Sequence, residues 1–164
     1  MVTDLGRAMV ITVSTRAAAG EYTDETGPVI AQRLKVWGFN VYPGVIVPDG
    51  EGVGAALQAA IASELSLIVT TGGTGLSPTD RTPEATAPLL DIQLPWLPEL
   101  FVRRGLDKGV ATAVLTRGVA GVAGRTMIIN LPGSRGAVDD GLETLGMVVP
   151  HAVRQLRGAG DHER

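Results

Sequence analysis

Hydrophobic residues along the chain fall into two kinds of segment that alternate. Short apolar runs at residues 9–14 and 65–71 are typical of strands that are buried on both faces of a sheet. Elsewhere apolar residues recur three or four positions apart, as do Ile30, Leu34 and Trp37, and this spacing places them on one face of a helix. The alternation of strands and helices predicts an α/β fold with a mostly parallel, doubly wound sheet.

Turn and cap signals locate the other predicted elements. The strand expected at residues 41–47 contains Pro43, which indicates a sheet edge or a bulge because proline cannot donate to the ladder. Residues 81–108 have a helical pattern that several prolines interrupt. The remaining expected elements are helices starting near Pro28, Pro48 and Ser134, a loop at residues 17–20, strands at residues 111–116 and 126–130 with a hairpin between them, and a final turn or helix near Val153.

The composition is that of a compact chain whose core has few aromatic side chains. The 164 residues fit one domain, which we expect to span residues 1–164 because no linker or internal repeat interrupts it. Apolar residues make up 45% of the chain and aromatic residues 4%, so Val, Ile, Leu and Ala must fill the core. Such a core is typical of a parallel sheet with helices on both faces. Residues 158–164 are expected to fray.

Charge, cysteine content and hydropathy argue against several classes of function. The net charge of −3 disfavours sequence-independent nucleic-acid binding, which depends on Lys and Arg contacts to phosphates. The absence of cysteine excludes disulfides, thiolate catalysis and Cys-ligated zinc. No apolar run approaches the roughly 18 residues that a membrane helix needs, and the first apolar stretch does not resemble a signal peptide. We therefore expect a cytoplasmic protein without nucleic-acid or membrane partners.

Four segments that follow predicted strands are rich in Gly, Pro, Ser, Thr or Asp. They are residues 14–16, 48–50, 72–80 and 131–134. In open parallel sheets, ligands bind outside the carboxyl ends of the strands, and parallel strands bring those ends to one edge. We expect the four segments to converge at that edge and to form one site.

The segment Gly72-Gly73-Thr74-Gly75 has the composition of a phosphate-binding loop. Glycine lets backbone N–H groups turn toward an anion and leaves no Cβ in its way, and the hydroxyls of Thr71 and Thr74 add donors. A tight strand-to-helix turn without a ligand has the same composition. Neither the Walker pattern nor the dinucleotide fingerprint fits, because no Gly-Lys pair exists and Ser14-Thr15-Arg16 follows the first strand.

Asp49 and Asp80 are the candidate catalytic and metal-binding carboxylates. Mg²⁺ in proteins commonly takes one or two carboxylates together with substrate phosphates, and two acids that flank a glycine loop suit that arrangement. Each acid also has a structural alternative, because Asp is a common cap of helix N-termini and Asp80 stands before Thr82 in a turn or cap position. Their expected position on one sheet edge favours the functional interpretation.

The order of these motifs resembles that of the MoaB/MogA molybdopterin-binding family. The motifs that carry the resemblance are Gly20-x-Tyr22-x-Asp24-x-x-Gly27-Pro28, Val47-Pro48-Asp49, Thr70-Thr71-Gly72-Gly73-Thr74-Gly75 with Asp80, Thr82-Pro83-Glu84-Ala85-Thr86, and Asn130-Leu131-Pro132-Gly133-Ser134. The resemblance implies a three-layer α/β fold, a homotrimer and a role in molybdenum cofactor biosynthesis. MogA-like members are expected to transfer AMP from ATP to molybdopterin with Mg²⁺, releasing pyrophosphate.

The resemblance also implies roles for individual residues. Asp49 and Asp80 match the two family acids needed for adenylyl transfer, and we expect them to hold Mg²⁺. The expected substrate and nucleotide site consists of Ser14, Thr71, Gly72, Gly73, Thr74, Gly75, Pro132, Gly133 and Ser134. Thr15 departs from the family pattern, which often has Ser-Asp-Arg after the first strand. Because the MoaB branch includes members not shown to catalyse the reaction, a non-catalytic trimeric molybdopterin-binding or scaffold protein is the alternative.

Overall fold

A mixed, mostly parallel sheet forms the centre of the computed structural model, which describes residues 4–158. Its strands run in the order β2-β1-β4-β7-β6-β5, and β3 also pairs with β1. The strands are β1 (Arg7–Val13), β2 (Asn40–Val41), β3 (Val45–Val47), β4 (Leu67–Thr71), β5 (Ile92–Gln93), β6 (Ala120–Ala123) and β7 (Thr126–Leu131). All pairings are parallel except that β6 is antiparallel to both β5 and β7.

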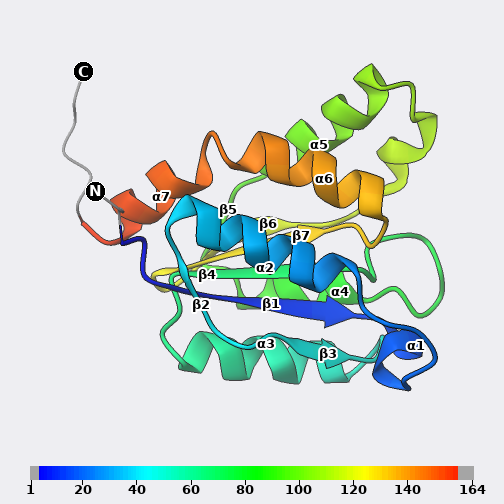
Figure 1. Cartoon of the computed structure of the whole chain (residues 1–164), viewed down its shortest axis with the longest axis horizontal. Helices are drawn as coiled ribbons and strands as arrows, with labels where there is room; N and C mark the ends of the chain where they lie inside the picture. The colour runs from blue at the N-terminus through cyan, green and yellow to red at the C-terminus, as the bar shows by residue number, and fades with distance from the viewer. Residues whose placement is uncertain (1–3, 159–164) are drawn as a thin grey trace.

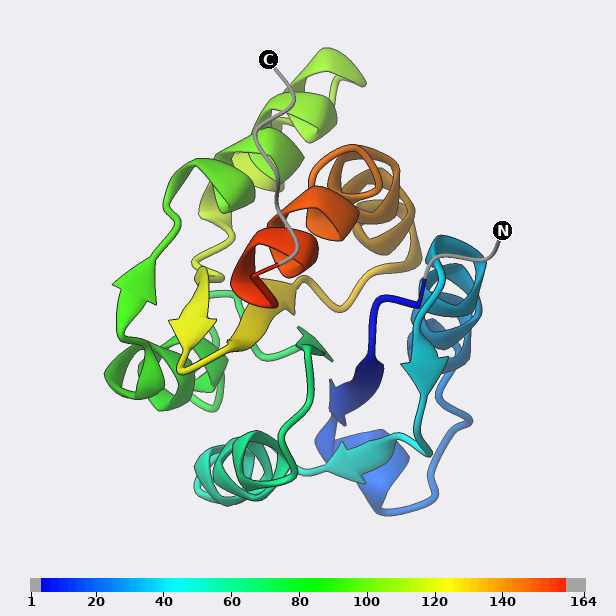
Figure 2. The same ribbon diagram turned by 90° about the vertical axis from the view of Figure 1, so that its left-hand side faces the viewer.

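Helices cover both faces of this sheet (Figure 1). One face packs against α2 (Thr26–Trp37), α5 (Trp96–Asp107), α6 (Arg135–Leu145) and α7 (Val149–Leu156), and the other against α3 (Gly52–Ala62) and α4 (Thr82–Thr86). The short remaining helices are α1 (Thr15–Ala18) and the 3-10 helices η1 (Ala87–Leu89) and η2 (Ala111–Leu115). Figure 2 shows the strands between the two helical layers. The predicted three-layer α/β fold with one hairpin is therefore confirmed.

Alternate residues of the central strands fill two separate cores. Val69 and Ile129 lie in the core beneath α2 and α6, whereas Ile68 and Ile128 lie in the core beneath α3. Successive side chains of a strand point to opposite faces of the sheet, so a strand covered on both faces needs apolar residues at every position. The continuous apolar runs in the sequence are the consequence of this two-sided burial.

Two predicted boundaries depend on proline and glycine, and the structure confirms both. The strand expected at residues 41–47 is divided at Pro43-Gly44 into β2 and β3, which both pair with β1 at the sheet edge. A Cβ on Gly44 would lie 2.9 Å from the carbonyl oxygen of Val10, so the chain passes very close to β1 at this point. Helix α2 ends at Gly38, whose φ of 110° is left-handed and favours glycine.

The predicted strand at residues 111–116 is wrong. Residues Ala111–Leu115 form the 3-10 helix η2, and the hairpin is made by β6 and β7, which join at Gly124 with a φ of 61°. Gly121 was expected between the strands but lies inside β6, where a Cβ would stand 2.2 Å from the carbonyl oxygen of Ile92. Glycine is needed at this position because β5 approaches closely, and not because the chain turns there.

Two further segments differ from expectation. The loop expected at residues 17–20 begins as helix α1, because the Ser14 hydroxyl caps it by accepting the N–H of Ala17 at 3.1 Å. Strand β5 interrupts the helical pattern expected over residues 81–108. No helix within residues 4–158 is long and apolar enough to span a membrane. Of the tail expected to fray, residues 159–164 lie outside the described part of the chain.

Asn130 joins four parts of the fold through its buried side chain, which is 1% exposed. Its amide nitrogen donates to the hydroxyls of Thr70 at 2.9 Å and Thr86 at 3.1 Å, and its amide oxygen accepts the N–H of Val119 at 3.1 Å. These bonds connect β7 to β4, to α4 and to the segment before β6. The asparagine of the Asn-Leu-Pro-Gly-Ser motif therefore has a structural role.

We expect Asn130→Ala to destabilise the protein by about 3 kcal/mol, because it leaves buried polar groups without partners. Chemical denaturation measures this loss as a lower free energy of unfolding. The matched control is Asn40→Ala, because Asn40 is exposed and its side chain makes no hydrogen bond within residues 4–158. The control should change stability by no more than about 0.5 kcal/mol. Equal effects of the two substitutions would contradict the structural role of Asn130.

Candidate active site

The carboxyl ends of β1, β3, β4 and β7 lie together at one edge of the sheet, on the side of α1 in Figure 1. Thr15 at the end of β1 donates its hydroxyl to Asp49 after β3, at 2.9 Å. Gly72 after β4 donates its N–H to the carbonyl of Leu131 at the end of β7, at 3.0 Å. The four segments expected to converge therefore form one continuous surface.

Two adjoining cavities occupy this edge. One, of about 870 Å³, is lined by residues that follow β1, β3 and β4, including Ser14, Asp49 and Asp80. The other, of about 430 Å³, extends from the glycine loop to Pro132 and Ser134. Both cavities are lined by Gly72, Gly73, Asp80 and Gly133. The glycine loop is therefore the boundary between two spaces.

The first two loop glycines are required by packing. Gly72 has a φ of 96°, and a Cβ there would lie 2.2 Å from the carbonyl oxygen of Val13. Gly73 has a φ of 68°, and a Cβ there would lie 2.3 Å from the Thr82 hydroxyl. Both positions combine a left-handed backbone with close contacts, so only glycine fits them. The tight-turn interpretation of these glycines is correct, but it does not exclude a ligand.

The donors that the loop presents differ from those expected. The Thr71 hydroxyl donates to the carbonyl of Pro132 at 2.9 Å, and the Gly72 N–H is bound to Leu131. Thr74 is 4% exposed, and its hydroxyl accepts from Thr116 at 3.3 Å. Both threonine hydroxyls thus serve the fold. The loop keeps its donors in the backbone, because the N–H groups of Gly73, Thr74 and Gly75 have no acceptor within residues 4–158.

Each candidate acid faces a glycine of the loop. Asp49 Oδ2 accepts from Thr15, while Oδ1 lies 3.2 Å from where a Cβ on Gly73 would stand. Asp80 Oδ2 accepts the N–H of Ser77 at 3.2 Å and lies 2.9 Å from where a Cβ on Gly75 would stand. The proposed capping role of Asp49 is wrong, because α3 has no side-chain cap.

The two acids could hold a magnesium ion only if other groups complete its coordination shell. Within the described residues there is no group of three or more His, Cys, Asp or Glu side chains that could enclose a metal. Mg²⁺ often uses one or two carboxylates and completes its shell with water and substrate phosphates. Asp49 and Asp80 lie beside a loop whose N–H groups are available within the described part of the chain, and they suit such an open arrangement.

Two predicted site residues cap helices. The Ser14 hydroxyl caps α1 and also lies 2.7 Å from the hydroxyl of Tyr22. The Arg16 guanidinium stacks on the Tyr22 ring, 5.1 Å from the ring centre. The Ser134 hydroxyl accepts the N–H of Ala137 at 3.3 Å and caps α6. Their hydroxyls therefore shape the rim of the site in the free protein.

Arg117 is an important residue that the sequence did not indicate. Its guanidinium donates to the carbonyl oxygens of Gly75 at 2.9 Å and Asp80 at 3.1 Å, and it forms an ion pair with Glu84. Its main-chain N–H donates to Thr74 at 2.9 Å. Arg117 therefore clamps the loop that carries Asp80. It stands alone before Gly118, and no spacing pattern relates it to the loop.

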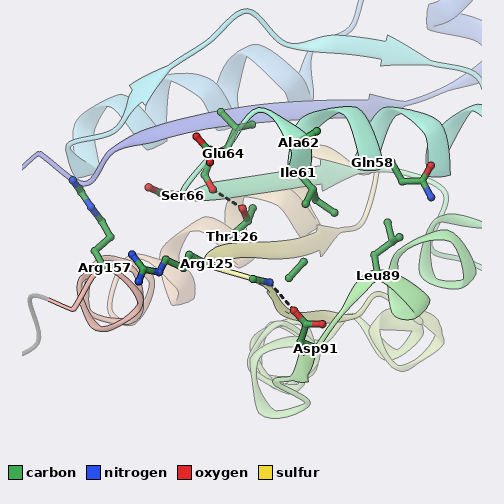
Figure 3. A pocket seen from close by; sticks show the side chains of 13 residues that line it. Gln58, Ile61, Ala62, Glu64, Ser66, Leu89, Asp91, Arg125, Thr126 and Arg157 are labelled. Atoms are coloured by element: carbon green, nitrogen blue, oxygen red, sulfur yellow. Dashed lines mark hydrogen bonds between the residues drawn. The ribbon is translucent and has the colours of Figure 1, made fainter.

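A third cavity, of about 730 Å³, lies at the opposite end of the strands (Figure 3). Asp91 there accepts the N–H of Gly124 at 2.7 Å, and the Thr126 hydroxyl donates to the carbonyl of Leu65 at 2.6 Å. The first bond connects the segment before β5 to the turn before β7, and the second connects the segment before β4 to the start of β7. None of the predicted site residues lines this cavity, so the candidate site remains at the carboxyl edge.

We expect Arg117→Met to loosen residues 75–80, because the loop carbonyls lose their guanidinium donor. Native-state hydrogen exchange should show amides of this loop exchanging roughly tenfold faster or more. The matched control is Arg125→Met, because Arg125 is exposed at the opposite edge of the sheet. If both variants left exchange in the loop unchanged, Arg117 would not be its clamp.

The pair between Arg117 and Glu84 predicts a dependence of stability on pH. The hydrogen bond from Arg117 holds the pKa of Glu84 below its usual value of 4.5. A lowered pKa in the folded state adds stability above the usual pKa, and this stability is lost as pH falls through the lowered pKa. Glu84→Gln should therefore destabilise the protein at neutral pH, and the difference from wild type should vanish in acid.

Chemical denaturation of wild type and Glu84→Gln, from neutral pH into acid, measures the difference in their free energies of unfolding. In an Arg117→Met background, the pH-dependent effect of Glu84→Gln should become clearly smaller, because the largest cause of the pKa shift is gone and only the main-chain hydrogen bond and Arg81 still lower the pKa of Glu84. A pH-dependent effect of the same size in that background would contradict the assignment to Arg117.

Comparison with known proteins assigns the chain to a family. The family described as "Probable molybdopterin binding domain" matches residues 9–151. The Mog protein structure from Mycobacterium ulcerans is 53% identical with a TM-score of 0.87, covering 92% of this chain and 98% of that one. The tungsten cofactor synthesizing protein MoaB from Pyrococcus furiosus is 37% identical with a TM-score of 0.84, covering 92% and 96%.

Curated relatives carry related names. A molybdopterin adenylyltransferase from Pyrococcus furiosus is 39% identical over 152 residues, which cover 90% of this chain and 89% of that protein. A molybdenum cofactor biosynthesis bifunctional protein from Synechococcus elongatus is 42% identical over 156 residues, 94% of this chain and 48% of that protein. The chain thus spans about half the length of such bifunctional relatives. As its motifs predict, the chain belongs to the molybdopterin-binding family that includes MogA and MoaB.

Proposed function

We propose that this protein transfers AMP from ATP to molybdopterin with the help of Mg²⁺ and releases pyrophosphate. One observation carries the proposal: two carboxylates face a loop in which three N–H groups have no acceptor among the described residues, at the boundary of two cavities. The similarity to proteins named molybdopterin adenylyltransferase supports the same reaction. We expect it to take place in the cytoplasm.

The reaction requires positioning more than activation of a nucleophile. An oxygen of the terminal phosphate of molybdopterin attacks the α-phosphorus of ATP and forms a new P–O bond. The bond from the α-phosphorus to the oxygen that bridges it to the β-phosphorus breaks, and its electron pair leaves with pyrophosphate. Because the nucleophile is already an anion, the protein's task is to align two polyanions and to offset their charge.

Residues of the glycine loop are suited to this task. The N–H groups of Gly73, Thr74 and Gly75 would donate to phosphate oxygens at the boundary of the two cavities. The two substrates would approach from opposite sides of the loop, so that their phosphates meet near Gly73. Asp49 and Asp80 would hold Mg²⁺, which when bound neutralises phosphate charge and stabilises the leaving pyrophosphate.

We propose further that the chain assembles as the homotrimer expected of its family. Three apolar side chains near the second cavity are well exposed: Leu76 at 67%, Val114 at 57% and Leu115 at 48%. Leu76 and Leu115 line this cavity together with the glycine loop. Exposed apolar side chains that gather beside a site are typical of a surface that a protein partner covers.

The second candidate function is that of a trimer that binds molybdopterin without catalysis. Its support is the similarity to proteins whose names state no transfer reaction, such as the molybdenum cofactor biosynthesis protein B from Staphylococcus carnosus, which is 36% identical over 120 residues, 71% of this chain and 71% of that protein. Such a protein would bind molybdopterin tightly and release no pyrophosphate from ATP. The same experiment therefore separates the two candidates.

We expect Asp80→Asn and Asp49→Asn each to slow pyrophosphate release by about a hundredfold or more, because each removes negative charge that would hold Mg²⁺. The assay combines purified protein, ATP, Mg²⁺ and molybdopterin. The matched control is Asp107→Asn, since Asp107 is exposed at the end of α5 and should leave the rate unchanged. Wild-type protein that releases no pyrophosphate would refute adenylyl transfer, and an Asp80→Asn variant as fast as wild type would refute the role assigned to Asp80.

A further inference from the structure

The hydroxyl of Thr15 forms a closed set of bonds with Asp49, 34 positions away in the chain. Thr15 Oγ1 donates to Asp49 Oδ2 at 2.9 Å, and the Thr15 N–H donates to the same oxygen at 3.2 Å. In return, the Asp49 N–H donates to Thr15 Oγ1 at 3.1 Å. One small side chain thus binds both the main chain and the side chain of the acid.

The two carboxylate oxygens of Asp49 therefore differ in their hydrogen bonds. Oδ2 accepts two hydrogen bonds from Thr15, whereas Oδ1 accepts none within residues 4–158. Oδ1 lies on the side of the glycine loop, 3.2 Å from where a Cβ on Gly73 would stand. A carboxylate held at one oxygen cannot rotate freely, so its other oxygen keeps a constant direction.

Packing and capping do not account for Thr15. Its side chain is exposed, so it adds little to the core. It does not cap α1 either, because the Ser14 hydroxyl accepts the N–H of Ala17. Its bonds to Asp49 are the contacts that distinguish it from an ordinary surface threonine.

We propose that Thr15 is a positioning residue, which holds one oxygen of Asp49 so that the other faces the glycine loop as a single metal ligand. This inference rests on the proposed function, in which Asp49 helps to hold Mg²⁺ on the nucleotide. It adds that Asp49 binds the metal through Oδ1 alone, and that the strength of this bond depends on a residue that is not itself a metal ligand.

The first test measures metal binding without turnover. Mn²⁺ is added with a non-hydrolysable ATP analogue to the full-length protein, and EPR reports the bound metal. Thr15→Val removes the hydroxyl at nearly constant volume and should weaken Mn²⁺ binding about 10-fold to 100-fold, the usual effect of losing a group that orients a metal ligand. Thr15→Ser keeps the hydroxyl and should bind Mn²⁺ nearly as tightly as wild type.

A matched control and a double variant show whether Thr15 acts through Asp49. Thr144→Val makes the same chemical change in α6, away from the site, and should leave Mn²⁺ binding unchanged. In an Asp49→Asn background, Thr15→Val should cause little further loss, because the group that it orients is already altered. A full additional loss in that background, or wild-type binding by Thr15→Val alone, overturns the inference.

Failure of the proposed function can be told apart from failure of this inference. If wild-type protein binds no Mn²⁺ with the ATP analogue, the proposed metal-dependent function fails. The orientation of Asp49 in crystals of ligand-free wild type and Thr15→Val then decides the positioning role. A carboxylate that turns in the variant supports that role, and one that keeps its orientation overturns it.

Discussion

The close meeting of three strand ends at Gly72 is the constraint on which the candidate site depends. In the parallel register, Thr71 pairs with both Thr12 and Leu131, so β1, β4 and β7 end at the same level. There the Gly72 N–H binds the carbonyl of Leu131, and any Cβ on Gly72 would collide with the carbonyl of Val13. The chain must leave β4 in a left-handed conformation, which directs the following residues across the edge of the sheet.

This constraint divides the loop into parts with different tasks. Gly72, Thr71 and the Thr74 hydroxyl are used to connect the loop to its neighbours. The N–H groups of Gly73, Thr74 and Gly75 have no acceptor in the described structure and lie at the boundary of two cavities. Backbone donors in a packed turn do not have to be ordered when a ligand binds, so they suit the recognition of phosphate at low entropic cost.

The two acids depend on neighbours that hold them in place. Arg117 holds the segment of Asp80 through its carbonyl groups, and Thr15 holds Asp49 through one carboxylate oxygen. In the proposed reaction the metal shell is completed by substrate phosphates, so the protein needs only a few ligands in constant positions. Residues that do no chemistry themselves would then set the strength of metal binding.

The sequence by itself determined the layers of the fold, the convergence of the four loops and the family, because these follow from local periodicity, strand order and motif spacing. It did not show that residues 111–115 form a 3-10 helix, or that Gly121 lies inside β6 against β5 and not in a turn. Nor did it show which hydroxyls serve the fold, or that Arg117 and Thr15 hold the site. Those roles depend on contacts between residues far apart in the chain, and only the tertiary structure decides such contacts.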